Sequence, residues 1–248
     1  MADAPLTPFT IVVTSCGRFD LLERTMRSLY AHLDEAPART IIVEDSGDDA
    51  VSDALSDVGA PHEIEFLINR PQLGQMAAID RAYAMVRTPF IFHCEDDWEF
   101  FRTGFIGESR AVLDHHGDVS LVSLRARDAL NPLLRDLPDQ SDAGLQYFLA
   151  DPARHPEYFS YTFNPGLRRL ADALQIGPFA ALGYEPDVSY AFKKAGFREA
   201  HLSDPAVRHI GDERHVDDPF APKRPRSALG RLKRSASKRM KRLARLLK

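Results

Sequence analysis

Residues 90–98 read FIFHCEDDW, an apolar run that passes directly into three consecutive acids. An apolar run of this length, preceded by Pro89 and followed by polar residues, predicts a buried strand. Because a strand end fixes its backbone, the carboxylates of Glu95, Asp96 and Asp97 cannot all point into solvent. Oxygen ligands of this kind suit Mg²⁺ or Mn²⁺, which commonly keep a substrate phosphate among their ligands. The stretch therefore predicts a metal site at a strand end; the alternative is a solvated acidic turn.

The sequence before this stretch alternates between strand and helix patterns. Runs rich in β-branched apolar residues predict strands, and apolar residues recurring at three- and four-residue steps predict helices. Strands are expected at 8–16, 40–46 and 62–69, and helices at 19–33, about 50–57 and 75–86. Each crossover is long enough for a helix, so the pattern predicts an α/β fold with a mainly parallel central sheet and helices on both faces.

Polar residues follow all four of these predicted strands. In open parallel sheets, ligands bind beyond the carboxyl ends of the strands. Those ends carry Ser15-Cys16, Glu44-Asp45-Ser46, Asn69-Arg70 and the acids 95–97. The functional site is therefore expected at this edge of the sheet.

The second half of the chain has weaker periodicity. Residues 119–126 predict a further strand, and 131–156, rich in Asp, Pro and Leu, predict a loop or mobile flap. Helical stretches are expected within 166–200, and a short closing strand at 205–210.

Composition narrows the class of protein. With 44% hydrophobic and 27% charged residues, the chain has enough apolar material for a globular core. Cys16 and Cys94 are too few for a disulfide framework and lack zinc-site spacing, so two reduced thiols are expected. Neither G-x-G-x-x-G nor the P-loop pattern occurs, which argues against a dinucleotide-binding Rossmann domain or a P-loop NTPase.

The ends of the chain differ from each other in charge and hydropathy. The N-terminus lacks the features of a signal peptide, and no apolar run approaches the roughly 18–20 residues that cross a bilayer. Residues 223–248 contain twelve Lys or Arg and no acid, which leaves a net charge of −16 on residues 1–222. Pro222 and Pro225 mark the boundary, so we expect a globular domain over 1–221 and a basic tail over 222–248.

The tail has the pattern of an amphipathic helix. Its apolar residues recur at three- and four-residue steps: Leu229, Leu232, Ala236, Met240, Leu243 and Leu247. The remaining face is almost entirely Lys and Arg, which predicts a helix lying on an anionic membrane surface. Nucleic acid or a calmodulin-like protein is the alternative partner, and the regular apolar stripe favours the membrane over nucleic acid.

Four stretches, in this order, resemble the family 2 glycosyltransferases and their GT-A relatives. They are FTIVVTSCGRFDLLERTMRSL (9–29), IIVEDSGDD (41–49), NRPQLGQMAAIDRAYAMVRTPFIFHCEDDWEF (69–100) and GYEPDVSYAFKKAGFREAHL (183–202). The resemblance covers about residues 9–210. It implies a GT-A fold and an inverting, metal-dependent transfer of a sugar from a nucleotide donor.

The resemblance also implies which residues bind the donor. The second-strand acid that contacts the base in the family corresponds to Asp45, with Glu44 as the alternative. The segment Thr14-Ser15-Cys16 borders the same base, and Arg18, Asn69 and Gln75 belong to the same donor site. Glu95 and Asp96 correspond to the first part of the D-x-D motif. Glu95 is one methylene longer than the family's Asp, which changes its reach.

The catalytic and metal-binding residues follow from the same resemblance. Asp97, the last acid of the motif, corresponds to the metal ligand. Glu185 stands where the family places its catalytic base, and Asp187 is the alternative. A structural interpretation of these two acids is that they stabilise a helix N-terminus. His209 fits a further metal ligand after the closing strand, and His215 is the second option.

Together these features predict a cytoplasmic glycosyltransferase held peripherally on the inner face of the cell membrane by its tail. It would transfer a sugar, from a UDP-sugar as the family default, to a hydroxyl of a glycan or lipid-linked acceptor of cell-surface polysaccharide, lipopolysaccharide or glycolipid synthesis. Mn²⁺ or Mg²⁺ is the expected cofactor, and no nucleic acid is expected. An inactive GT-A-like scaffold at the membrane and a sugar nucleotidyltransferase are the alternatives.

Overall fold

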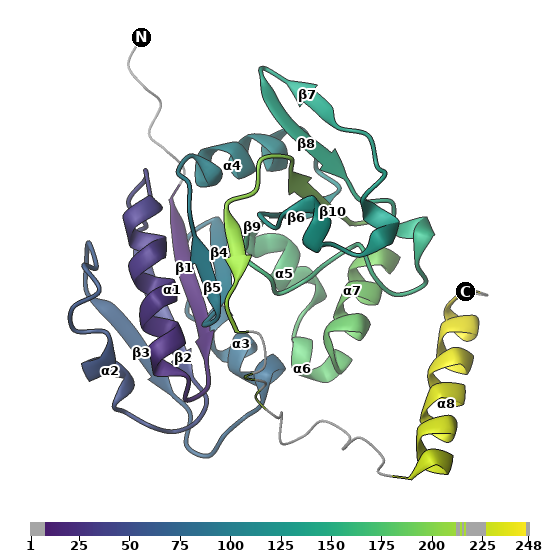
Figure 1. The fold of residues 1–248 in the computed structure, drawn as a ribbon, viewed down its shortest axis with the longest axis horizontal. Helices are drawn as coiled ribbons and strands as arrows, with labels where there is room; N and C mark the ends of the chain where they lie inside the picture. Colours follow the sequence, from purple (N-terminus) through teal and green to yellow (C-terminus); the bar gives the residue numbers. More distant parts are fainter. Residues whose placement is uncertain (1–7, 212–213, 215, 217–226, 247–248) are drawn as a thin grey trace.

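A nine-stranded sheet lies at the centre of the part of the chain that the computed structural model describes, residues 8–211, 214, 216 and 227–246 (Figure 1). Its strands are β1 Phe9–Ser15, β2 Arg39–Glu44, β3 Ile64–Ile68, β4 Phe90–Glu95, β6 Val119–Ser123, β7 Gln140–Asp142, β8 Leu145–Leu149, β9 Gly166–Arg169 and β10 Arg198–Leu202. The helices are α1 Phe19–His32, α2 Val51–Ala54, α3 Gln75–Tyr83, α4 Phe105–His115, α5 Leu170–Ile176, α6 Phe179–Leu182, α7 Glu185–Lys194 and α8 Ala228–Leu246.

The N-terminal half of the sheet forms as predicted. The strand order begins β3-β2-β1-β4, and every neighbouring pair in this part is parallel. The pairing aligns the strand ends, since Ser15 lies opposite Glu44 and Thr14 lies opposite Glu95. The polar residues that follow the strands therefore meet at one edge of the sheet, and the α/β fold with a mainly parallel sheet is confirmed.

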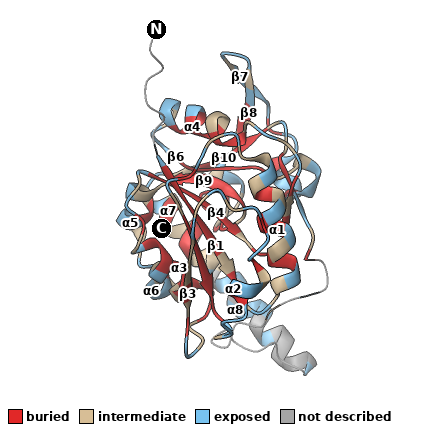
Figure 2. Ribbon diagram, turned by 90° about the vertical axis from the view of Figure 1, so that its left-hand side faces the viewer, coloured by how far each residue is buried: buried red, intermediate tan, exposed pale blue. Residues whose placement is uncertain are grey.

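Strand β1 does not alternate between apolar and polar residues, because both of its faces are buried. Ile11 and Val13 pack with α1, α2 and α4 on one face, whereas Val12 packs with α3, α5, α6 and α7 on the other. Figure 2 shows the resulting buried layer through the middle of the molecule. A strand covered on both faces by helices has to be apolar throughout.

Strand β9 is the main departure from the prediction. It runs antiparallel between β4 and β6, in a segment for which only helices were expected. Its sequence, GLRR, does not alternate between apolar and polar residues. The two arginines also give no indication of a buried strand. Arg168 is nevertheless fully buried, because its guanidinium donates to the carbonyls of Thr162 and Asn164 and to the hydroxyl of Tyr161.

Gly166, at the start of β9, offers a test of this strand. A methyl group there would overlap the backbone carbonyl of Val122, which cannot move without disturbing β6. We expect Gly166→Ala to lower the free energy of unfolding by about 1–3 kcal/mol, the usual cost of overpacking. Denaturant unfolding measures this change, and Gly117→Ala, which adds a methyl into open space, is the matched control. Equal midpoints for the two variants would contradict the placement of β9.

Two further segments differ from or refine the expectations. Residues 131–156, predicted as a loop or flap, contain the antiparallel hairpin of β7 and β8, which extends the sheet beyond β10. The predicted closing strand is confirmed as β11 Val207–His209, which pairs with β5 Trp98–Phe100 in a separate small sheet. The predicted C-terminal helix is confirmed as α8. The boundary near residue 222 lies outside the described residues.

Candidate active site

The three predicted acids form a tight turn between β4 and β5. The carbonyl of Asp97 accepts a hydrogen bond from the backbone N–H of Ile210 (2.9 Å), which ties this turn to the segment after β11. As a result the Nε2 of His209 lies 3.3 Å from the Oδ2 of Asp97. The two residues predicted as metal ligands therefore face each other, although they lie far apart in the sequence. His215 lies outside the described residues.

Arg18 provides the positive charge opposite these acids. Its guanidinium forms an ion pair with Asp96, and its Nη1 lies 2.9 Å from the Oδ2 of Asp97. Arg18 also donates to the carbonyl of Arg214, at 2.8 Å. One guanidinium thus pairs with two buried carboxylates. The predicted donor-binding Arg18 thus lies directly at the acid turn.

Burial changes the protonation of two of the acids. Burial, reinforced by Asp97 and Glu185, raises the pKa of Glu95 to about 8. The pKa of Asp96 is raised to about 6, again mainly by burial, against the opposing effect of Arg18. Glu95 accepts hydrogen bonds from the side chains of Gln75 (3.3 Å) and Trp98 (3.2 Å). The predicted donor residues Gln75 and Glu95 are therefore neighbours.

The second-strand acids have different surroundings. The carboxylate of Asp45 accepts hydrogen bonds from the side chain of Asn69 (2.7 Å) and from the N–H groups of Leu73 (2.9 Å) and Gly74 (2.8 Å). These bonds hold the loop before α3 against the end of β2. Asp45 and Asn69, both predicted at the donor site, thus form one buried pair that shapes the edge of the sheet.

Glu44 connects β2 to the end of β1. Its Oε1 accepts hydrogen bonds from the N–H groups of Gly17 (3.0 Å) and Ser46 (2.7 Å), whereas its Oε2 is buried without a partner. Cys16 lies in the same acidic surroundings, where burial together with Glu44 raises the pKa of its thiol to about 11. The Oγ of Ser15 is also buried without a hydrogen-bond partner. Thr14, Ser15 and Cys16 therefore lie at the same edge of the sheet as the predicted acids.

Asp97 and His209 suit a cation whose remaining ligands are supplied by the substrate. Among the described residues, no cluster of three or more His, Cys, Asp or Glu side chains could hold a metal ion. Asp97 and His209 nevertheless place one carboxylate oxygen and one ring nitrogen 3.3 Å apart. Mg²⁺-type sites often use one or two protein ligands together with substrate phosphates and water. The pair fits a cation of this kind.

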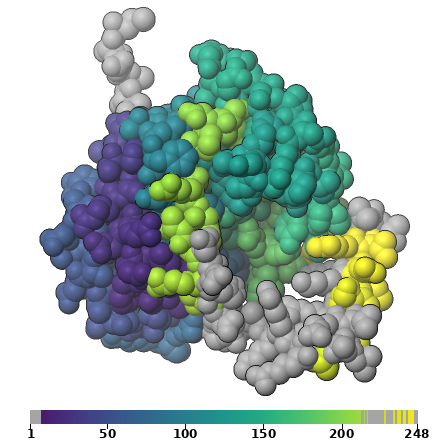
Figure 3. Space-filling model, in the orientation of Figure 1, coloured from purple at the N-terminus to yellow at the C-terminus, as the bar shows by residue number. Residues whose placement is uncertain are grey.

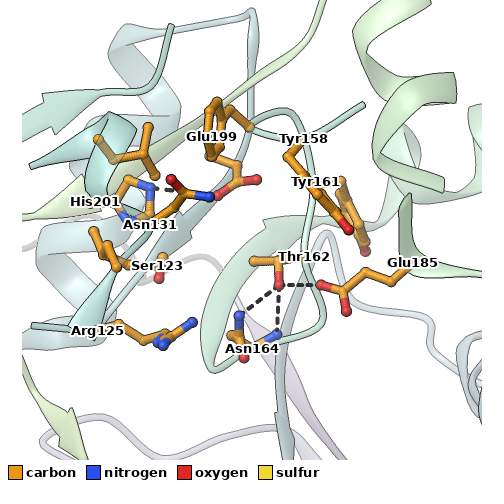
Figure 4. A pocket seen from close by; sticks show the side chains of 13 residues that line it. Ser123, Arg125, Asn131, Tyr158, Tyr161, Thr162, Asn164, Glu185, Glu199 and His201 are labelled. Atoms are coloured by element: carbon orange, nitrogen blue, oxygen red, sulfur yellow. Dashed lines mark hydrogen bonds and ion pairs between the residues drawn. The ribbon is translucent and has the colours of Figure 1, made fainter. Parts of the chain in front are cut away.

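Glu185 begins α7 and faces a pocket next to the acid turn. Its Oε1 accepts a hydrogen bond from the hydroxyl of Thr162 at 2.5 Å, and Figure 4 shows both side chains at the wall of this pocket. Burial raises the pKa of Glu185, with a further contribution from Glu199. A carboxylate with a raised pKa is a better proton acceptor, so the geometry suits a general base.

Asp187 faces away from this pocket. One of its oxygens accepts from the N–H of Tyr184 (3.3 Å), and the other forms an ion pair with Arg245 of α8. Arg245 and Arg242 also bind the carboxylate of Glu157, at 2.5 and 3.1 Å. Figure 3 shows the described part of α8, in yellow, at the edge of the teal and green part of the molecule. The two acids predicted as candidates for the base are thus separated, and only Glu185 lines the pocket.

Three residues of this region escaped the sequence analysis. Glu199 and His201 line the pocket from β10 (Figure 4). Arg168 of β9 holds the loop that carries Thr162. The alternation of Glu199 and His201 with the buried Ala200 is a period of two, the signal that could have revealed a strand with a functional face. No comparable signal marks Arg168.

Several solved structures resemble this chain in fold at low sequence identity. The mannosyltransferase PcManGT from Pyrobaculum calidifontis, in complex with GDP-Man and Mn²⁺, is 12% identical with a TM-score of 0.55, over 79% of this chain and 54% of its own. TarS 1–349 from S. aureus is 13% identical with a TM-score of 0.58, over 81% of this chain and 59% of its own. GalNAc-T7 with UDP, GalNAc and Mn²⁺ is 13% identical with a TM-score of 0.59, over 84% of this chain and 44% of its own.

These likenesses establish the fold, which is the GT-A fold of nucleotide-sugar glycosyltransferases. The chain spans about half the length of the three structures. No protein-family model matches the sequence, and no curated protein matches it. Within the described part of the chain, no helix has the length and apolar character needed to span a bilayer.

Proposed function

We propose that this protein is a metal-assisted glycosyltransferase that moves a sugar from a nucleoside-diphosphate sugar to a hydroxyl group, with inversion. The observation that carries the proposal is the arrangement at one edge of the sheet. Asp97 and His209 face each other at the end of β4, and Glu185 lines the pocket at the start of α7. A site for a leaving diphosphate and a general base are the two parts that this reaction requires.

The structural neighbours support a nucleotide-sugar donor. One of them was solved with GDP-Man and Mn²⁺, and another with UDP, GalNAc and Mn²⁺. In this chain the edge of the sheet that carries Thr14–Cys16, Glu44 and Asp45 would contact the base. Glu95, Asp96, Gln75 and Arg18 would lie along the rest of the donor. A UDP-sugar is the donor that we propose.

Asp97 and His209 would hold the divalent cation, Mn²⁺ or Mg²⁺. When bound, such a cation neutralises charge that develops on a leaving diphosphate. The protein's own contribution is to fix the two ligands. The strand pairing of His209 with Trp98 and the bond from Ile210 to the Asp97 carbonyl hold them against each other. Arg18 supplies a second, permanent positive charge beside Asp97.

Glu185 would remove the proton from the attacking hydroxyl. The hydrogen bond from Thr162 orients one of its oxygens at the wall of the pocket (Figure 4). If the acceptor lies in this pocket, its hydroxyl attacks the sugar from the side opposite the diphosphate. Attack from that side inverts the anomeric centre.

The position of α8 supports a lipid-linked acceptor at a membrane surface. Arg242 and Arg245 fasten α8 to Glu157 and Asp187, next to the pocket. Met240 and Leu243 of the same helix remain 66% and 59% exposed. An anionic membrane bound by α8 would therefore lie close to the opening that receives the acceptor. Peripheral attachment to the inner face of the cell membrane and a role in polysaccharide, lipopolysaccharide or glycolipid synthesis are part of this proposal.

Deleting residues 223–248 tests the membrane part of the proposal. The segment carries twelve basic residues. At about 1 kcal/mol for each Lys or Arg near an anionic surface, loss of even half of them should weaken binding by more than about 10³-fold. Flotation with vesicles containing phosphatidylserine measures the binding, and neutral phosphatidylcholine vesicles are the control. Unchanged binding of the shortened protein would rule out the tail as the anchor.

A further inference from the structure

The pocket beside Glu185 has a size and lining of its own. Its volume is about 200 Å³, and its walls come from β6, β10, the loop before β9 and the segment around Asn131 (Figure 4). Pockets for drug-sized ligands have volumes of roughly 300–1,000 Å³. A space of this size suits one sugar ring. Tyr158, Phe159 and Tyr161 supply the flat apolar surfaces on which the C–H groups of such a ring can pack.

Several buried polar atoms in this pocket lack a partner. Neither ring nitrogen of His201 has a hydrogen bond, although the residue is only 1% exposed. The hydroxyl of Ser123 and the Nε of Arg125 are also buried without an acceptor or donor. The carboxylate of Glu199 lies 3.5 Å from the Nε2 of His201, beyond a good hydrogen bond. Buried polar groups are usually satisfied, so these atoms call for a polar ligand.

Phe148 fixes the orientation of His201. The two rings stack at 4.8 Å with an interplanar angle of 10°, and the guanidinium of Arg127 covers the other face of Phe148 at 3.9 Å. The imidazole edge is thereby held toward the pocket. A rigid pair of hydrogen-bonding groups, Glu199 and His201, suits recognition of hydroxyl groups at fixed positions.

The charges of the pocket restrict the ligand further. Glu185 and Glu199 both line it, and Arg125 is the cation among the residues that line it. The Nη2 of Arg125 donates to the carbonyl of Ala129 (2.7 Å) and its guanidinium lies over the ring of Trp98, so its buried Nε is left for a ligand. A ligand with a carboxylate or phosphate on the ring would meet two acids here. A neutral or amino sugar meets no such repulsion.

We infer that this pocket binds the terminal sugar ring of the acceptor, and that Glu199 and His201 select a neutral or amino sugar over an acidic one. The inference rests on the proposed function, because it takes Glu185 as the base for a hydroxyl of this ring. The donor diphosphate belongs at Asp97, so the ring that touches the base is that of the acceptor. Glu199 and His201 would hold other hydroxyls of the same ring and set which hydroxyl reaches Glu185.

Ligand-observed NMR on the full chain, with UDP and Mn²⁺ present, tests the inference. The probes are the methyl glycosides of glucose, galactose, mannose and glucosamine, together with the methyl glycoside of glucuronic acid. We expect saturation transfer to at least one neutral or amino sugar and none to the glucuronide. Glu199→Gln and His201→Phe should each raise the Kd of the bound probe by about 10- to 100-fold, which is the usual cost of losing a hydrogen bond to a charged or buried group.

The matched control is Glu63→Gln, which makes the same change at an exposed position before β3. Thermal unfolding of each variant confirms that it is folded. Binding of the glucuronide as strong as that of the neutral sugars, or equal binding by wild type and both pocket variants, would overturn the inference. Failure of every probe to bind while UDP binds with Mn²⁺ would also overturn it and leave the proposed function standing. Failure of UDP and related nucleotides to bind would count against the proposed function itself.

Glu199→Gln should also change the pH dependence of transfer. Burial raises the pKa of Glu185, and the negative charge of Glu199 raises it further. A general base is active when deprotonated, so kcat rises as the pH increases through this pKa. Removing the charge of Glu199 lowers the pKa of Glu185, and the acidic limb of the kcat profile should move to lower pH. His201→Phe should leave the limb in place. If the acidic limb of the kcat profile stays in place in Glu199→Gln, the role of Glu199 beside the base is wrong.

Discussion

Glu185→Gln is expected to lower kcat by about 10²–10⁴-fold, the usual contribution of general-base catalysis. Glutamine keeps the size of the side chain and can still accept the hydrogen bond from Thr162, but it cannot take up a proton. The Kd for the nucleotide should change little, because Glu185 lines a pocket that includes none of the residues proposed to contact the nucleotide. Single-turnover transfer and titration calorimetry measure the two quantities separately.

Stability provides the control for this variant. The raised pKa of Glu185 means that folding favours its protonated form, so its ionised form costs folding free energy above the ordinary pKa of glutamate. Glu185→Gln should therefore unfold at neutral pH no more easily than the wild type. Asp187→Asn provides the comparison between the two candidate bases. Near-normal turnover in Glu185→Gln together with a large loss in Asp187→Asn would reverse the assignment.

Asp97→Asn is expected to remove the metal dependence of donor binding and to lower kcat/KM by at least about 10²-fold. A metal that neutralises a leaving group contributes several kcal/mol to the transition state, and each 1.36 kcal/mol is tenfold in rate. Asparagine keeps the shape of the turn but loses the charge that faces His209. Titration of UDP with and without Mn²⁺ measures the effect.

Glu99→Gln is the matched control for Asp97→Asn. Glu99 lies two residues further along, and its carboxylate pairs with Arg208 and Arg24 on the outer side of β5. The control should keep the Mn²⁺ dependence of the wild type. Mn²⁺-dependent binding that survives in Asp97→Asn would show that the cation is held elsewhere.

The sequence predicted the first four strands because each is an apolar run that ends in polar residues. Such runs are apolar because the strand is buried on both faces. The local sequence therefore shows that the strand lies inside the fold. The same signal located the acids 95–97 and the second-strand acids Glu44 and Asp45 at one edge. The meeting of Asp97 and His209 followed from the resemblance, since nothing in the intervening sequence specifies the pairing of β11 with β5.

The pocket could not be predicted in the same way. It depends on β9, which is short, carries two arginines and pairs antiparallel between two strands that lie far from it in sequence. Arg168 is buried there because carbonyl and hydroxyl oxygens of the preceding loop surround it. Those contacts exist only in the folded chain. The role of Arg18 also differs from a simple donor contact, because its guanidinium pairs with Asp96 and Asp97.

Titration calorimetry of UDP, GDP and dTDP against the full chain, with Mn²⁺ and then with EDTA, tests the proposed chemistry most directly. The pair Asp97–His209 is expected to complete its coordination with diphosphate oxygens, so at least one nucleotide should bind, and Mn²⁺ should strengthen that binding at least about tenfold, or 1.4 kcal/mol. If none of the three nucleotides binds, or if binding is the same in EDTA, this edge of the sheet does not hold a metal-bound diphosphate.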